Sequence, residues 1–350
     1  MGKLTIVGLG LIGGSIGLGL KRAQPENTEV VGFDLDREVM TRAQRSGVVQ
    51  AIASSLEEAV SDATMVIVAT PIVSMRKVFQ TMGPHLRRGA VVTDTASTKG
   101  DVLRWADEFL PEGVHFVGGH PMAGKEQQGL HMAEAGLFED RPYAIVPSVR
   151  ALPGAVNAVV GLAQVLGARP FFLDADEHDA YAAAVSHLPL LTSVALFNLA
   201  RKSTAWPELA NLSGPAFRDL TRLASGEPEM SHDIFLTNRE NVLHWLDRYI
   251  GELQRFAELI ASEKEDETLF RSLAETQIER NIFLEKLPRR DDPALGVELP
   301  SSADSFLQML TGTLWQERQR AKEITEAMQE RAEKAAWEER VRRRKLDIDE

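Results

Sequence analysis

The sequence predicts a two-part fold in which an α/β domain with a doubly wound parallel sheet precedes an all-helical domain. Buried strands alternate with helices over the first half of the chain. A glycine-rich turn joins the first strand to the first helix. After Leu173 the hydrophobic period changes, and long helices follow without a convincing strand. With 350 residues, 44% of them hydrophobic, the chain is long enough for two cores.

The alternation of strands and helices predicts the α/β domain element by element. Expected strands cover residues 3–7, 29–33, 65–69, 90–94, 115–118 and 143–146. Expected helices between the earlier strands include residues 56–61 and 73–85. One more helix and strand, residues 154–166 and 169–173, complete this domain, which we assign to residues 1–173.

The second part of the chain reads as helical. We expect helices at residues 176–202, 215–224, 238–264 and 267–285, with a kink or broken turn at Pro189. We assign residues 174–286 to a substrate and dimerisation domain. The pattern of residues 287–350 predicts a proline-containing linker followed by a charged helix. In one interpretation, the apolar stripe of this helix packs on the helical domain or on a second subunit; in the other, the helix is a solvated tail.

The turn after the first strand carries glycines at the three positions that a dinucleotide-binding loop needs. Gly8 suits a tight turn, Gly10 lets the backbone approach a pyrophosphate, and Gly13 lets the helix pack closely on the strand. Asp34 ends the second strand 21 residues after Gly13, where a carboxylate binds a ribose hydroxyl and repels a 2′-phosphate. These features predict a Rossmann-type domain that binds NAD rather than NADP. The expected cofactor-binding residues are Gly8, Gly10, Leu11, Ile12, Gly13, Asp34, Thr70 and Pro71.

Composition narrows the classes of function. A net charge of −12 argues against a nucleic-acid-binding surface, which would be basic. The chain has no cysteine, and its histidines show no spacing typical of metal ligands, so we expect neither thiol chemistry nor a metal. No leader-like segment opens the chain, and we expect a cytoplasmic protein without a membrane partner.

Polar residues follow the strands of the predicted sheet. In open parallel sheets, ligands bind beyond the carboxyl ends of the strands, so Ser97 and His120 are expected to converge beside the nicotinamide. A histidine there suits removal of a hydroxyl proton, because its reference pKa lies near neutrality, and Ser97 is a candidate to orient it. The alternative is that His120 only hydrogen-bonds a turn.

Two further groups of polar residues lie on the predicted helical domain. Ser186 and His187 precede Pro189 in an otherwise apolar helix, where His187 is either a pocket residue or a satisfied core histidine. Arg218 and Arg222 share one helix face, and an arginine fork binds a carboxylate well. The alternative for these arginines is a surface ion pair with Asp219.

These motifs together resemble the prephenate/arogenate dehydrogenase family of tyrosine biosynthesis over roughly residues 1–285. The resemblance is carried by the glycine loop at residues 8–15, residues 94–99, His-Pro-Met-Ala-Gly at 120–124, Ser-His-Leu-Pro at 186–189, and Phe-Arg-Asp-Leu-Thr-Arg at 217–222. Members oxidise the ring C4 alcohol of prephenate or arogenate and pass hydride to the nicotinamide, while CO₂ leaves and the ring becomes aromatic.

The resemblance implies roles for individual residues and a homodimer formed through the helical domain. His120 matches the residue that draws the proton from the hydroxyl, and Ser97 matches the serine that assists it. Arg222 matches the arginine that binds a substrate carboxylate, and Ser186 and His187 match pocket residues. Prephenate-specific members often carry a histidine where this chain has Leu190, and some carry a tryptophan near position 231, which is absent here. Arogenate use or dual specificity therefore stays open.

Two other functions remain compatible with the sequence. A β-hydroxyacid dehydrogenase or imine reductase shares this architecture but would not need Ser97 paired with His120. A catalytically silent NAD-sensing protein would keep the nucleotide fold without turnover, and the intact catalytic motifs argue against it.

Overall fold

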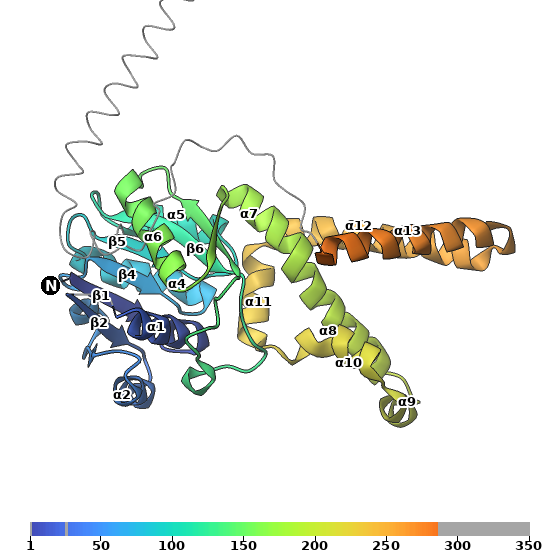
Figure 1. The fold of residues 1–350 in the computed structure, drawn as a ribbon, viewed down its shortest axis with the longest axis horizontal. Coiled ribbons are helices and arrows are strands. Elements are labelled where there is room, and N and C mark those ends of the chain that lie inside the picture. Colours follow the sequence, from blue (N-terminus) through green and yellow to red (C-terminus); the bar gives the residue numbers. More distant parts are fainter. Residues whose placement is uncertain (1, 25–26, 286–350) are drawn as a thin grey trace, which may run out of the picture.

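The computed structural model describes residues 2–24 and 27–285, so the expected linker and C-terminal helix lie outside the described residues. An eight-stranded sheet forms the first part of the chain, in the order β3-β2-β1-β4-β5-β6-β7-β8 (Figure 1). The strands are β1 (Gly2–Val7), β2 (Thr28–Phe33), β3 (Ala51–Ile52), β4 (Met65–Val68), β5 (Val91–Asp94), β6 (His115–Pro121), β7 (Pro142–Pro147) and β8 (Arg169–Phe172).

The α/β fold class predicted from the sequence is confirmed, with one correction to the strand directions. Neighbouring strands from β3 to β6 pair in parallel, but β7 runs antiparallel to β6, and β8 pairs in parallel with β7. The reason is the connection: residues 122–141 hold only a short 3₁₀ turn, η2 (Leu130–Met132), and no crossover helix. A parallel pairing would need a crossover connection that returns the chain to the same end of the sheet, usually through a helix.

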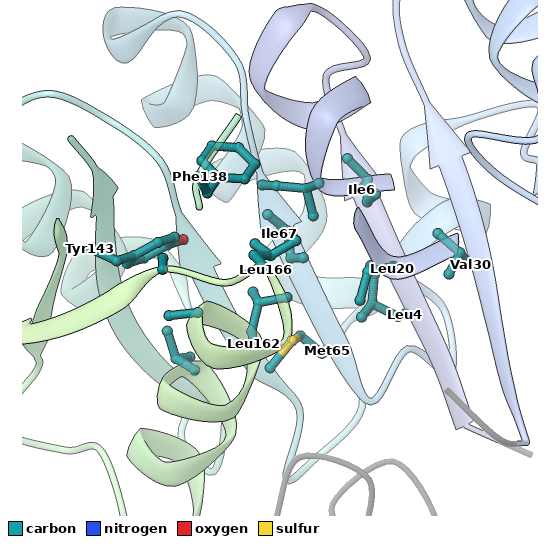
Figure 2. Packing of buried hydrophobic residues seen from close by; sticks show 14 of the residues in the cluster. Leu4, Ile6, Leu20, Val30, Met65, Ile67, Phe138, Tyr143, Leu162 and Leu166 are labelled. Atoms are coloured by element: carbon teal, nitrogen blue, oxygen red, sulfur yellow. The ribbon is translucent and has the colours of Figure 1, made fainter. Parts of the chain in front are cut away.

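Helices pack on the sheet through apolar side chains that are almost completely buried (Figure 2). In the labelled cluster, Leu4 of β1 lies beside Leu20, and Leu166 lies beside Ile67 of β4. The helices of this part are α1 (Leu11–Ala23), α2 (Arg37–Ser46), α3 (Leu56–Val60), α4 (Ile72–Met82), η1 (Gly83–His85), α5 (Gly100–Phe109) and α6 (Pro153–Val165). This core holds the strand ends in fixed positions, and the site is built on those ends.

The second part is helical throughout its described residues, as the sequence predicts. Its elements are α7 (Ala175–Ala182), η3 (Ala183–His187), α8 (Leu188–Arg201), α9 (Trp206–Leu212), α10 (Pro215–Thr221), η4 (Arg222–Ser225), α11 (Pro228–Thr237), α12 (Arg239–Ala261), η5 (Glu263–Glu265) and α13 (Asp266–Glu285). The helices α12 and α13 run side by side and project away from the sheet (Figure 1).

The expected irregularity at Pro189 is a π-helical turn. The segment η3 (Ala183–His187) interrupts the long helix between α7 and α8. Proline has no N–H to donate to the preceding turn, and a π turn accommodates that missing bond. This wider turn contains both Ser186 and His187, the two polar residues that the sequence marks on this helix.

The two parts meet through specific polar contacts. On the helix α11, the Asp233 carboxylate accepts a hydrogen bond from the Val73 backbone N–H at 3.0 Å, at the start of α4. The hydroxyls of Thr98 and Thr237 lie 2.8 Å apart. These contacts fix the helical domain over the edge of the sheet where β4 and β5 end.

Candidate active site

The backbone packing of the loop between β1 and α1 requires glycine at two of its positions. Gly8 adopts φ +93°, and a Cβ there would lie 2.5 Å from the Ala69 carbonyl oxygen at the end of β4. A Cβ on Gly13 would overlap the Gly8 carbonyl oxygen. A Cβ on Gly10, in contrast, would meet nothing within 4 Å. Gly8 and Gly13 are therefore required for packing, whereas Gly10 borders open space.

The N-terminus of α1 suits the pyrophosphate of a dinucleotide. Gly10 caps the helix without a side-chain hydrogen bond, and the first turn contains no acidic residue, so its backbone N–H groups face the open side with a positive dipole end. The side chains of Leu11 and Ile12 pack on the core instead. The Asp34 carboxylate lies beside the loop, because it accepts a hydrogen bond from the Leu9 N–H at 2.8 Å. These residues fit the dinucleotide expected from the sequence.

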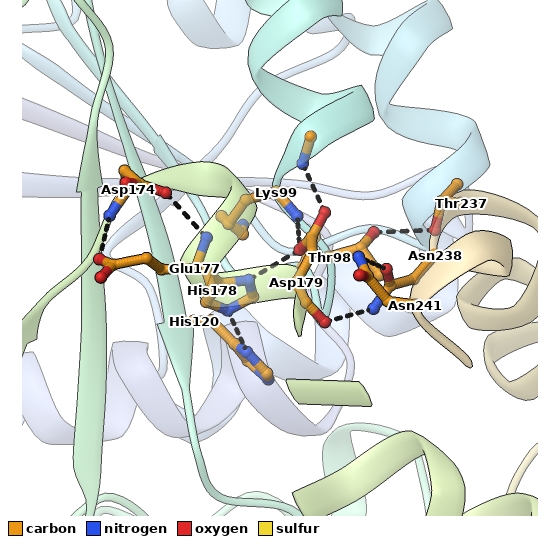
Figure 3. Close-up of polar contacts among 12 residues, drawn as sticks. Thr98, Lys99, His120, Asp174, Glu177, His178, Asp179, Thr237, Asn238 and Asn241 are labelled. Atoms are coloured by element: carbon orange, nitrogen blue, oxygen red, sulfur yellow. Dashed lines mark hydrogen bonds and ion pairs between the residues drawn. The ribbon is translucent and has the colours of Figure 1, made fainter. Parts of the chain in front are cut away.

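His120 is the last residue but one of β6, and it is 7% exposed. Its Nδ1 lies 2.9 Å from Nε2 of His178 on α7, and Nδ1 of His178 lies 2.8 Å from Oδ1 of Asp179 (Figure 3). The imidazole of His120 is thus oriented by His178, and no hydrogen bond joins it to Ser97 among the contacts of the described residues. Ser97 lies in the partly buried turn between β5 and α5.

A buried ion pair supports the backbone that carries His120. The Lys99 ammonium pairs with the Asp94 carboxylate, and both side chains are fully buried. The same ammonium donates to the Gly119 carbonyl at 2.8 Å, and the Asp94 carboxylate accepts from the Gly119 N–H at 3.1 Å. Both backbone groups of the residue before His120 are therefore held by this pair.

Burial controls the protonation of the three imidazoles. It lowers the pKa of His120 well below its usual 6.5, and the nearby His178 and Lys99 act in the same direction. Burial also lowers the pKa of His178, although Asp179 opposes it. For His187, burial lowers the pKa to about 4, against the opposing effects of Asp179 and of the Ser97 backbone. All three rings are neutral at pH 7.

His187 is held from the helix α12. The Asn238 amide nitrogen lies 3.1 Å from His187 Nδ1 and also donates to the Asp179 backbone carbonyl at 2.7 Å. Because the amide donates, Nδ1 of His187 accepts and Nε2 carries the proton. That Nε2 is buried, and the Ser97 backbone lies close enough to the ring to raise the pKa of His187 against the effect of burial. The π turn that carries His187 therefore meets the turn that follows β5.

Arg222 begins η4 and forms an ion pair with Glu126, not with Asp219. Glu126 belongs to the loop that follows His120, so the guanidinium of the helical domain reaches the loop of the α/β domain. The Arg222 side chain is 60% exposed, and such a pair contributes little to stability. It does show that Arg222 reaches a carboxylate close in sequence to His120.

The structure brings together several residues that sequence reasoning missed. Asp94, Lys99, His178 and Asp179 surround His120, yet the acidic run at residues 174–179 predicted only a helix N-cap. Asp174 does cap α7, since it accepts from the Glu177 N–H at 2.8 Å. Asp179 lies further along the helix and turns towards α5, a contact that only the three-dimensional fold creates. Within the described part of the chain, no cluster of side chains is suited to hold a metal ion.

Comparison with known proteins gives one family for both parts of the chain. The family model described as prephenate dehydrogenase, nucleotide-binding domain, matches residues 16–171, and the model described as prephenate dehydrogenase, dimerization domain, matches residues 174–275. A prephenate dehydrogenase of Bacillus subtilis is 33% identical over 271 residues, which are 77% of this chain and 72% of the relative.

Solved structures give the same result. The chain superposes on an Aquifex aeolicus prephenate dehydrogenase, in complex with hydroxyphenyl propionate and NAD⁺, with a TM-score of 0.74 and 29% identity, over 80% of this chain and 98% of that one. It also superposes on the Synechocystis arogenate dehydrogenase with a TM-score of 0.69 and 28% identity, over 80% of this chain and 99% of that one.

Proposed function

Because the chain belongs to the prephenate dehydrogenase family, we propose that it oxidatively decarboxylates prephenate, arogenate or both with NAD as the hydride acceptor. The products are 4-hydroxyphenylpyruvate or tyrosine, with CO₂. The observation that carries the proposal is the buried, neutral imidazole of His120. It lies at the same edge of the sheet as the glycine loop, because the parallel strands that lead to both end at that edge.

In this reaction the residues of the chain accept one proton and bind one substrate carboxylate. His120 accepts the proton of the ring C4 hydroxyl as the hydride leaves the same carbon, and Ser97, in the turn between β5 and α5, is the candidate to assist it. Bound NAD supplies the nicotinamide that takes the hydride. Arg222 binds a substrate carboxylate with its guanidinium fork, and Ser186 and His187 line the pocket from the π turn. Aromatisation and CO₂ loss supply the driving force, so positioning is the main task of the protein.

Choice between the two substrates depends on the side chain of the substrate, which is a keto acid in prephenate and an amino acid in arogenate. Leu190 is 8% exposed and packs in an apolar cluster with Ile234. It offers no hydrogen bond to a keto acid at that position. This favours arogenate use or dual specificity over strict prephenate use.

Steady-state kinetics with purified full-length protein test the function. Formation of NADH or NADPH is followed with prephenate and with arogenate, each in the presence of NAD or NADP. The value of kcat/KM is then compared for the four pairs of substrate and cofactor. We expect turnover of at least one substrate and a preference for NAD. Absence of turnover with both substrates, together with turnover of a β-hydroxy acid or cyclic imine, would favour the related dehydrogenases. Tight NAD binding without any turnover would favour a sensor.

Arg222→Ala should raise KM by about 10-fold to 100-fold, because it removes a charge-assisted hydrogen bond worth roughly 1.5–3 kcal/mol. The effect on kcat should be smaller, since the carboxylate is bound in both ground and transition states. Arg218→Ala, on the preceding helix α10, is the matched control and should leave KM within about 2-fold of wild type. Equal KM values for the two variants would remove Arg222 from the substrate site.

The pH dependence of kcat/KM should follow the lowered pKa of His120. A base acts only when it is unprotonated, and burial moves the loss of that form to lower pH. Activity should therefore persist as the pH falls through 6.5 and decline only below it. A rising limb centred above pH 6.5 would show that a different group, or an exposed imidazole, is the base.

We also infer a homodimer formed through the helical domain. Large apolar side chains are exposed along α8, α12 and α13, among them Leu199 (74%), Ile260 (70%) and Phe270 (73%). The run Ala175–Arg201 has the length and mean hydropathy (1.5) of a membrane-spanning helix, with 28% of its most apolar window buried. Burial against a second copy accounts for both features. Analytical ultracentrifugation should give twice the mass of one chain. The cytoplasmic location of the protein stays a prediction.

A further inference from the structure

We propose that His178 and Asp179 are positioning residues for His120: they fix which of its ring nitrogens carries the proton, and they supply the negative charge that balances the proton it accepts. The chain of contacts runs from Asp179 through His178 to His120 (Figure 3). The proposal rests on the proposed function, in which His120 is the base.

The contacts determine the tautomers in order. An ionised carboxylate only accepts hydrogen bonds, so Nδ1 of His178, 2.8 Å from Asp179 Oδ1, carries a proton. In the neutral ring, Nε2 of His178 is then an acceptor. Nδ1 of His120 lies 2.9 Å from it and must donate. The Nε2 of His120 is left with a free lone pair, which is the form that a base needs.

The charge of Asp179 is held in place by the first turn of α5. Its Oδ1 accepts from the Lys99 N–H at 2.7 Å, and its Oδ2 accepts from the Gly100 N–H at 2.8 Å. Burial raises the pKa of Asp179, but the hydrogen bonds from His178, Gly100 and Lys99 outweigh it and hold that pKa below its usual 3.8. A helix N-terminus also favours an anion. The Asp179 carboxylate of the helical domain thus binds the N-terminus of α5 in the α/β domain.

The charges around His120 leave Asp179 without a cationic partner. Lys99 and Asp94 are paired with one another, so their charges sum to zero. His187 is neutral at pH 7, since its pKa is about 4. With neutral imidazoles, these six side chains therefore carry one net negative charge. When the hydroxyl O–H bond breaks and its proton joins Nε2 of His120, the cluster becomes neutral, which favours the transfer in a buried site.

The sequence pair His-Asp does not by itself create this arrangement. His232 and Asp233 on α11 repeat the pair, but Nδ1 of His232 lies 3.9 Å from Asp233 Oδ1, and the His232 side chain is 70% exposed. Burial and the contact with His120 distinguish the pair at 178–179. His232→Gln is therefore a matched control.

The kinetic test compares His178→Phe, His178→Gln and His232→Gln in the full-length enzyme with saturating NAD. His178→Phe removes the acceptor of the His120 Nδ1–H, and kcat should fall by about 10²-fold while KM stays within about 3-fold. The amide oxygen of a glutamine can accept that hydrogen bond, so His178→Gln should recover at least about 10-fold of the loss. His232→Gln should match wild type. Equal losses in both variants at position 178, or wild-type kcat in His178→Phe, would overturn the proposal.

A tautomer measurement on the ligand-free enzyme is independent of turnover. ¹⁵N spectra of histidine-labelled wild type should show His120 protonated on Nδ1 and unprotonated on Nε2 at pH 7. His178→Phe should weaken that preference, because the acceptor of the His120 Nδ1–H is then gone. A wild-type His120 protonated on Nε2 would overturn the proposal even if no variant folds. If wild type turns over its substrate and His178→Phe has the same kcat as wild type, only this proposal fails; if wild type shows no turnover, the proposed function fails.

Discussion

His120→Asn should lower kcat by about 10²-fold or more, which is the contribution expected of a positioned general base. Asparagine can keep a hydrogen bond to His178, so the fold of the loop should persist, but it cannot accept a proton. The loss should therefore appear in kcat rather than in NAD affinity or KM. Measured kcat, KM and the dissociation constant for NAD separate these possibilities.

His85→Asn serves as the matched control for this substitution, because His85 is an exposed histidine at the end of η1. It should leave all three constants at wild-type values. A His120→Asn enzyme with near-wild-type kcat would remove His120 from the chemistry. The base would then have to be sought elsewhere around the pocket.

Lys99→Met should lower the free energy of unfolding by about 3–5 kcal/mol, because it leaves the Asp94 carboxylate buried without its partner. The same change removes the hydrogen bond to the Gly119 carbonyl, so kcat should fall as well. Urea unfolding at one fixed protein concentration measures the first effect, since dimer formation makes stability depend on concentration.

Two further variants decide whether the buried pair is the cause. Lys77→Met removes an exposed lysine from α4 and should change stability by no more than about 0.5 kcal/mol. Adding Asp94→Asn to Lys99→Met should recover part of the lost stability, because the uncompensated charge is gone. A double variant less stable than the sum of its parts would contradict this account of the pair.

Local patterns were sufficient to predict most of the sheet and the glycine loop. The strand ends near residues 7, 68, 94 and 172 follow from short apolar runs bounded by turn residues. The roles of Gly8 and Gly13 follow from spacing, and the close approaches of their would-be Cβ atoms explain why spacing is informative there. In each case the relevant interaction lies within a few residues or one strand–helix unit.

Features that depend on distant residues were not predicted. The antiparallel direction of β7 depends on the absence of a crossover helix in residues 122–141, a segment whose composition resembles an ordinary loop. The partner of Arg222 is Glu126, nearly a hundred positions away, rather than the neighbouring Asp219. The contact of Asp179 with Lys99 joins the two domains. Sequence spacing carries no information about such pairs without the fold.

A crystal structure of the enzyme with NAD and hydroxyphenyl propionate tests the central claim most directly. We expect His120 Nε2 within hydrogen-bonding distance, about 2.6–3.2 Å, of the phenolic oxygen, and the Arg222 guanidinium on the carboxylate of the same molecule. The ring should lie against the nicotinamide. If His120 and Arg222 open into separate clefts, or the ligand contacts one without the other, the proposed function and its mechanism are wrong.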